Sequence, residues 1–392
     1  MLTAVRAPLA LGASALLLLA SGAAGSPSGG SDGTAIRDAV VRSYTDFAHA
    51  IYAESETHAR RLRTRIRALV DAPTPASLAA AREAWRDGRR VYGRSEVLRF
   101  YGGPIDAPDR GVETFLNAWP LDEAYIDAVE GNPDAGIIND PVRYPNLEGS
   151  VLTWLNERGG EANVSIGWHA IEFLLWGQDL YADGPGRRSH EDYVAGTGRN
   201  AERRSEYLLR IADLLVEHLV QVKEAWAPNA PNYRAAFERE AHQSIRNIIT
   251  GMTVLSGFEM SGERMAVAYE TRDQEEELSC FSDTSHVDMI ANQEGILAVY
   301  RGTGPGTSGP GLRELARAVD ADLAAEIDVR LTAGLEALQA IPAPFDRAIQ
   351  GPDGSPGRRA VLAAVEALEA QAESLAALGL LLGSDIPLAP GG

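Results

Sequence analysis

The segment Ile166-Gly167-Trp168-His169-Ala170-Ile171-Glu172-Phe173-Leu174-Leu175-Trp176-Gly177 places a histidine and a carboxylate in an otherwise apolar stretch of helical character. On a helix, residues three positions apart share a face, so the His169 imidazole and the Glu172 carboxylate can converge on one point. A buried carboxylate without a partner is costly and usually takes up a proton instead. The pair therefore predicts a partner, which is a metal ion, another side chain or a proton.

The rest of the chain also has a helical pattern. No segment alternates strictly between polar and apolar residues with β-branched enrichment, so a sheet is not expected. The apolar periodicity and the proline and glycine stops predict helices over about 34–70, 76–101, 190–226, 232–255, 259–276, 285–300, 312–339 and 358–382. The predicted class is all-α. Long helices joined by short turns indicate two up-and-down, four-helix-bundle-like halves, over residues 34–228, which carry the His169 motif, and 229–390.

The N-terminus resembles an export signal. Arg6 precedes the apolar run from Leu9 to Ala20, and small residues follow, so we expect a signal peptide over residues 1–24 and a flexible leader over 25–33. The run is shorter than the roughly 20 residues that a spanning helix needs, and no later segment qualifies. We therefore expect an exported protein of the periplasm or cell envelope. Its single cysteine, Cys280, cannot form an internal disulfide and is either buried and inert or a thiol near a site.

The charge balance limits the partners. The chain has 36 basic and 55 acidic residues, a net charge of −19, which argues against nucleic acid because phosphate binding needs basic patches. The same balance fits a surface that attracts cations, and it fits equally well an ordinary acidic exterior.

His169 and Glu172 are the leading metal-ligand candidates, although the same spacing also fits a buried hydrogen-bonded pair that only fixes packing. The zincin motif is absent, because Ala170 and Phe173 occupy the places of its glutamate and second histidine. Two ligand sets remain open. With His286 as a distant third ligand, the pair would form a zinc hydrolase site that leaves one position open for a water molecule. With carboxylates as the additional ligands, the site would favour iron. The candidates for the latter are Glu259, Glu263 and Asp283.

Several separate stretches resemble the imelysin-like family, which is grouped with the M75 peptidases and includes the iron-regulated protein A type. Gly167 to Glu172 matches the GxHxxE signature of that family. Further similar blocks are Arg99 to Asp106, Leu116 to Asp127 and Leu255 to His286. The resemblance covers most of the chain from about Thr34. It implies an all-helical protein of two bundle-like halves, with the GxHxxE site near their junction, exported to the bacterial envelope and commonly tied to iron acquisition.

By this resemblance, His169 and Glu172 are the residues most strongly expected at the site, and Asp283 and His286 are weaker candidates. The preferred hypothesis is an envelope protein that binds iron or an iron-containing ligand for uptake, with His169 and Glu172 as metal ligands and possible envelope uptake components as partners. The alternative is a metal-dependent endopeptidase, with zinc, that uses the same two residues and a third ligand such as His286.

Overall fold

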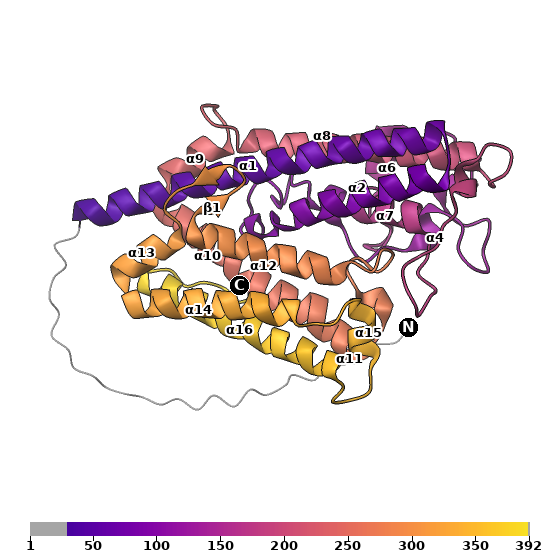
Figure 1. Cartoon of the computed structure of the whole chain (residues 1–392). Helices are drawn as coiled ribbons and strands as arrows, with labels where there is room; N and C mark the ends of the chain where they lie inside the picture. Colours follow the sequence, from indigo (N-terminus) through magenta and orange to yellow (C-terminus); the bar gives the residue numbers. More distant parts are fainter. Residues whose placement is uncertain (1–29, 391–392) are drawn as a thin grey trace.

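Three long helices form one layer of the molecule. The computed structural model describes residues 30–390. Helix α1 (Gly30–Asp71) packs against α2 (Pro75–Gly93) and α8 (Ala201–Ala225) along most of their lengths (Figure 1). The break between α1 and α2 has a local cause, because Thr74 caps α2. Its hydroxyl accepts a hydrogen bond from the Ser77 amide at 3.1 Å, and Pro75 occupies the first helical turn.

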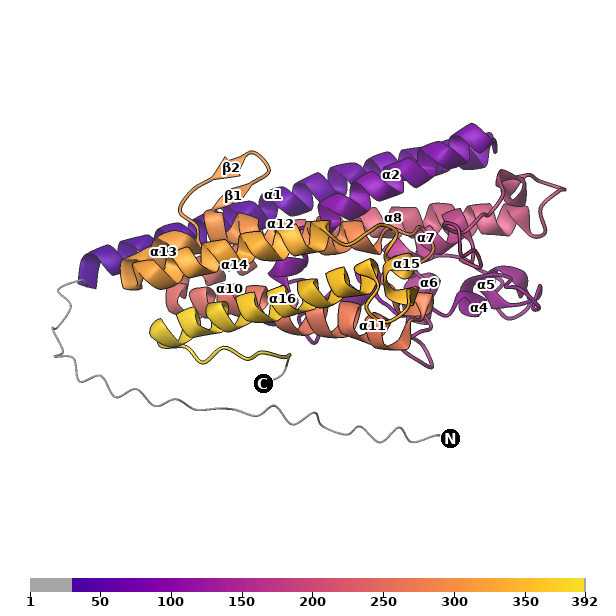
Figure 2. The same ribbon diagram turned by 60° about the horizontal axis from the view of Figure 1, so that its bottom comes forward.

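A second layer contains α10 (Ala241–Val254), α12 (Ser285–Arg301), α14 (Ala321–Gln339) and α16 (Pro356–Leu381). Helix α16 packs on α14 and α10, and α12 lies between α14 and α2, so that α12 joins the two layers (Figures 1 and 2). Buried apolar side chains from both layers form one continuous core, from Ile51 and Trp85 to Ile296, Leu331 and Leu375. The all-α prediction is therefore confirmed. None of the helices within residues 30–390 is both long and apolar enough to cross a membrane.

Shorter elements connect the long helices and surround the His169 segment. They are α3 (Glu113–Asn117), α4 (Glu123–Ile126), α5 (Gly136–Asn139), α6 (Gly149–Leu155), α7 (Trp168–Trp176), α9 (Tyr233–Arg239), α11 (Val267–Thr271), α13 (Leu312–Val319) and α15 (Phe345–Gln350). Single 3₁₀ turns span η1 (Glu96–Leu98), η2 (His190–Tyr193) and η4 (Gln274–Glu276), and η3 (Leu255–Ala266) is a π-helix. The strands β1 (Thr303–Gly304) and β2 (Thr307–Ser308) form a small hairpin.

The predicted helix boundaries are wrong at several points. The expected helix 312–339 is two helices, because the Asp320 side chain accepts hydrogen bonds from the amides of Asp322 and Leu323 and starts a new helix there. The expected helix 76–101 ends at Gly93, and that over 190–226 begins only at Ala201, after a 3₁₀ turn. The expected helix 232–255 is divided at Glu240. The expected helix 259–276 consists of the end of the π-helix η3, the short helix α11 and the 3₁₀ turn η4.

The N-terminal predictions lie partly outside the described residues. The predicted signal peptide, residues 1–24, falls there, as does most of the leader. The last residues of the predicted leader are helical, since α1 begins at Gly30.

Candidate functional site

Helix α7 carries the His169 motif and is buried over all nine of its residues. A buried helix end needs partners for its last carbonyl groups, and other segments supply them. The Tyr193 hydroxyl donates to the carbonyl oxygen of Leu174 at 2.5 Å, and Arg82 Nε donates to that of Leu175 at 3.0 Å. The Arg188 amide donates to the carbonyl oxygen of Trp176 at 2.7 Å. These contacts from η2, α2 and the loop after α7 fix the position of the helix.

Gly167 fixes the start of the same helix. Its φ of 96° lies in the region that favours glycine, and a Cβ at this position would lie 2.7 Å from the carbonyl oxygen of Leu116. The glycine of the motif therefore allows α7 to approach the backbone of α3 closely.

Replacing Gly167 by alanine is expected to destabilise the fold by about 2 kcal/mol or more, because a left-handed conformation costs about 1–2 kcal/mol and the new methyl group also meets backbone. Chemical denaturation followed by circular dichroism measures this loss. Gly131→Ala is the control, since Gly131 also has a positive φ but no neighbouring atom within 4 Å. Equal losses in the two variants would show that the approach to Leu116 does not matter.

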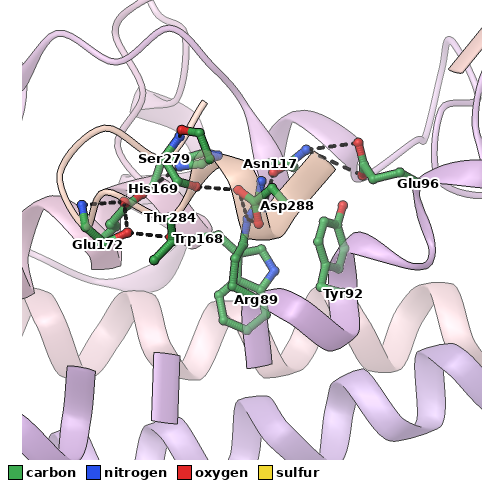
Figure 3. A network of polar contacts seen from close by, with 12 residues as sticks. Arg89, Tyr92, Glu96, Asn117, Trp168, His169, Glu172, Ser279, Thr284 and Asp288 are labelled. Atoms are coloured by element: carbon green, nitrogen blue, oxygen red, sulfur yellow. Dashed lines mark hydrogen bonds and ion pairs between the residues drawn. The ribbon is translucent and has the colours of Figure 1, made fainter. Parts of the chain in front are cut away.

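His169 and Glu172 contact each other directly. His169 Nδ1 lies 2.9 Å from Glu172 Oε2, and both side chains are fully buried (Figure 3). The other carboxylate oxygen, Oε1, accepts hydrogen bonds from the Ser282 amide at 3.0 Å and the Ser282 hydroxyl at 2.6 Å. The predicted convergence on one helical face is thus present, and both oxygens of Glu172 have partners within the protein.

The second nitrogen of the imidazole is different. His169 Nε2 is buried and has no hydrogen-bond partner among the described residues. Burial, with the nearby Arg89 and Arg264 guanidinium groups, holds the pKa of His169 well below its usual value, so the ring is neutral at pH 7. When Glu172 is ionised, Nδ1 donates its proton to the carboxylate, and this tautomer leaves the Nε2 lone pair free.

Burial also changes the protonation of Glu172. It raises the pKa of this carboxyl group to about 8, and the Asp288 carboxylate acts in the same direction, against the Ser282 hydrogen bonds and Arg89. The pair is therefore close to electrically neutral at pH 7. A cation that binds at Nε2 would favour the ionised form of Glu172 and release its proton.

Polar residues that sequence reasoning missed lie near the pair and join the two layers (Figure 3). Arg89 on α2 pairs with Asp288 on α12 at 3.1 Å, and the Ser279 hydroxyl donates to the second oxygen of Asp288 at 2.5 Å. Arg89 Nη1 also donates to Asn117 Oδ1, and Asn117 in turn lies beside Glu96. These partners are far apart in the sequence, and nothing in their local patterns marks them.

Glu96 continues this network to the π-helix. It is buried and pairs with Arg99 at 2.8 Å and with Arg264 at 2.7 Å. Despite burial, these guanidinium groups lower the pKa of Glu96 to about 2. Because the hydrogen bonds of a π-helix join residues five apart, Glu259 and Arg264 come together on η3, 2.7 Å apart.

Aromatic rings enclose the pair. The ring centroids of Trp119 and His169 are 5.0 Å apart, and Phe281 lies 5.9 Å from Trp119 and 5.3 Å from Phe173. Trp119 follows α3, Phe173 is on α7, and Phe281 belongs to the segment before α12. The site is thus built from both predicted halves of the chain.

The structure does not assemble the weaker candidates around His169. Within residues 30–390, no three His, Cys, Asp or Glu side chains are grouped so that they could hold a metal ion, so His169, Glu172 and His286 do not form a ligand set in this conformation. Asp283 is adjacent to Ser282, but its carboxyl group contacts that of Asp179. Glu263 is exposed on η3.

Three other candidates from the sequence are placed by the fold in environments that explain them without a metal. His286 lies in the first turn of α12, and burial lowers its pKa. Cys280 is 1% exposed, and burial raises the pKa of its thiol well above the usual value. A thiol in this environment stays protonated and unreactive. Glu259, an alternative iron ligand, is held by Arg264.

Stability is expected to fall as the pH rises from 6.5 to 8.5. The raised pKa values of Glu172, about 8, and Asp179, about 7, mean that the native state holds protons that the unfolded chain has released in this range. The histidines with lowered pKa, such as His218 at about 4, oppose this trend in the lower part of the interval, because the unfolded chain still holds part of their protons near pH 6.5. Their opposition fades about one pH unit higher, where they are neutral in both states. Urea unfolding at pH 6.5, 7.5 and 8.5 measures the trend. A rise in stability over this interval would contradict the assigned proton occupancy.

This geometry supports two kinds of chemistry. A neutral imidazole oriented through Nδ1 by a carboxylate can present Nε2 to a metal ion, or it can act as a general base. An enzyme that uses a nucleophilic side chain would also place a hydroxyl or thiol group next to Nε2. Among the described residues, no such group hydrogen-bonds to Nε2. The fold and site therefore define an all-helical protein with a buried, carboxylate-oriented histidine where its two layers meet.

Comparison with known proteins identifies the family. The model of the imelysin family, peptidase M75, matches residues 48–375, and the chain belongs to this family. An iron-regulated protein A from Synechococcus elongatus is 24% identical over 336 residues, which cover 83% of this chain and 80% of that protein. A crystal structure from Parabacteroides distasonis, named as an iron-regulated protein A precursor, has a TM-score of 0.66 at 18% identity and covers 87% of this chain and 95% of its own. The latter likeness supports the fold.

Proposed function

We propose that this chain is an exported envelope protein that binds a metal ion, with iron as its cargo, and that His169 Nε2 is the protein ligand. The observation that carries the proposal is the buried Nε2 without a partner, on a ring whose Nδ1 is directed at a carboxylate. Metal-ligating histidines usually have such a carboxylate on their other nitrogen. The names of the relatives, iron-regulated protein A, favour iron over other metals.

The roles of the two motif residues differ in this proposal. His169 contacts the metal, whereas Glu172 orients the ring and supplies negative charge across it, because Ser282 and His169 already occupy both of its oxygens. With one protein ligand in this conformation, water would complete the coordination of a bound cation. Imidazole suits iron as well as zinc, so the residues fit either ion.

The export part of the proposal rests on the N-terminal sequence. The apolar run from Leu9 to Ala20 with its flanking residues predicts a signal peptide, and one relative is named as a precursor. Outside the cytoplasm, an acidic chain with a net charge of −19 attracts cations.

The peptidase activity suggested by the family name is the second candidate, because a neutral histidine that a carboxyl group orients, as Glu172 orients His169, can serve as a general base. One experiment separates the two. The chain without residues 1–24 is loaded with Fe²⁺ under anaerobic conditions or with Zn²⁺, desalted, and analysed for metal and for cleavage of casein. We expect about one retained metal per wild-type chain, none in His169→Ala and no cleavage in either. Metal-dependent cleavage that is lost in His169→Ala would establish the peptidase instead.

A further inference from the structure

A surface pocket lies beside the buried histidine. It has a volume of about 450 Å³ and lies between the α3 region and the π-helix η3. Trp119 lines this pocket and also contacts the His169 ring, with 5.0 Å between ring centroids. Trp119 is partly exposed, whereas His169 is 1% exposed. Trp119 therefore separates the imidazole from the pocket.

The pocket is strongly acidic. Its lining includes five glutamates (Glu113, Glu157, Glu259, Glu263 and Glu276) and two arginines, Arg99 and Arg264. The arginines are already paired with Glu113, Glu259 and the buried Glu96. Among the described residues, no Lys or Arg pairs with the three remaining glutamates, Glu157, Glu263 and Glu276. Acidic walls of this kind concentrate cations near a cleft.

We infer that this pocket is the entry vestibule for the cation that reaches His169, with Glu157, Glu263 and Glu276 attracting it and Trp119 acting as the gate. The inference rests on the proposed function and extends it. The entering species is a small hydrated cation, since a porphyrin or another bulky anionic chelate would be repelled by the glutamates and stopped by the indole. Glu263, a candidate metal ligand from the sequence, instead attracts the cation before it reaches His169.

Association kinetics of Zn²⁺, followed by competition with a zinc-sensitive dye, test the vestibule. The triple variant Glu157→Gln, Glu263→Gln and Glu276→Gln should bind about tenfold more slowly at low salt, and the difference should disappear near 1 M salt, where the Debye length is about 3 Å. The control triple carries Gln at Glu366, Glu369 and Glu373, which are exposed on α16 and change the net charge equally. Equal slowing in both triples would overturn the vestibule.

Trp119 variants test the gate. Trp119→Ala should raise the association and dissociation rates by the same severalfold factor and leave Kd unchanged, and Trp119→Phe, which keeps an aromatic ring, should have a smaller effect in the same direction. Unchanged rates in folded Trp119→Ala and Trp119→Phe would overturn the gate. If the wild type binds no Zn²⁺, or His169→Ala binds it equally well, the proposed function itself fails. If His169→Ala loses Zn²⁺ binding as expected, the proposed function stands, and the association rates of the two triple variants then decide the vestibule alone.

Discussion

Replacing Asp288 by alanine is expected to reduce the free energy of unfolding by about 3–5 kcal/mol, because it leaves a buried guanidinium group without its counter-ion. Asp288 is 1% exposed and Arg89 is 2% exposed, and their pair joins α12 to α2 beside the site. The Ser279 hydroxyl loses its acceptor in the same variant. Urea or guanidinium denaturation followed by circular dichroism measures the loss.

The same two helices supply a matched control. Arg90 on α2 and Glu294 on α12 form an ion pair at 3.2 Å, but their side chains are 57% and 29% exposed. Solvent screens such a pair, so Glu294→Ala should cost less than about 1 kcal/mol. A double variant, Arg89→Leu with Asp288→Leu, should recover part of the loss of the single variant, because it removes both buried charges. Similar losses for Asp288→Ala and Glu294→Ala would show that burial of the pair is not decisive.

The second large effect is on metal affinity. His169→Ala should abolish binding, because it removes the ring that carries Nε2. Glu172→Gln should weaken binding by about 10–100-fold, which is the usual effect of removing a carboxylate behind a metal-binding histidine. In the wild type, affinity should also rise with pH up to about 8, since the cation displaces the proton from Glu172. Calorimetric titrations with Zn²⁺ at pH 6.5, 7.5 and 8.5 measure all three effects.

His218→Ala is the control for this comparison. His218 on α8 is also buried and has an unpartnered Nδ1, but its ring packs on Phe115, and within residues 30–390 no carboxylate hydrogen-bonds to it. Its removal should leave metal affinity unchanged. If Glu172→Gln abolishes binding as completely as His169→Ala, Glu172 is itself a metal ligand, as the sequence spacing first suggested, and its role as an orienting group is wrong.

The sequence predicted the helical class and the shared face of His169 and Glu172, because both follow from the spacing of residues along a helix. It did not predict what Glu172 would face. Ser282, which holds Glu172 Oε1, is 110 residues away, and Arg89 and Asp288 are 199 residues apart. Such contacts depend on how distant segments pack, which local periodicity does not encode. The π-helix was missed for a similar reason, since the apolar pattern of residues 259–276 also fits an α-helix.

The resemblance to the imelysin family directed attention to the His169 segment but did not predict the geometry around it. The GxHxxE signature identified Gly167, whose close approach to Leu116 explains the need for glycine. The resemblance also covered Asp283 and His286, which lie in the separate block from Leu255 to His286. In the structure that block supplies Ser282 to Glu172, and neither Asp283 nor His286 joins the His169 pair in a three-ligand group within residues 30–390.

Metal binding at His169 is tested most directly by an anomalous difference map from crystals of the wild-type protein soaked in Zn²⁺ or Fe²⁺. The proposed function predicts a peak about 2.0–2.1 Å from His169 Nε2, with Glu172 still directed at Nδ1. A peak bound by carboxylates elsewhere, with Nε2 still unoccupied, would contradict it.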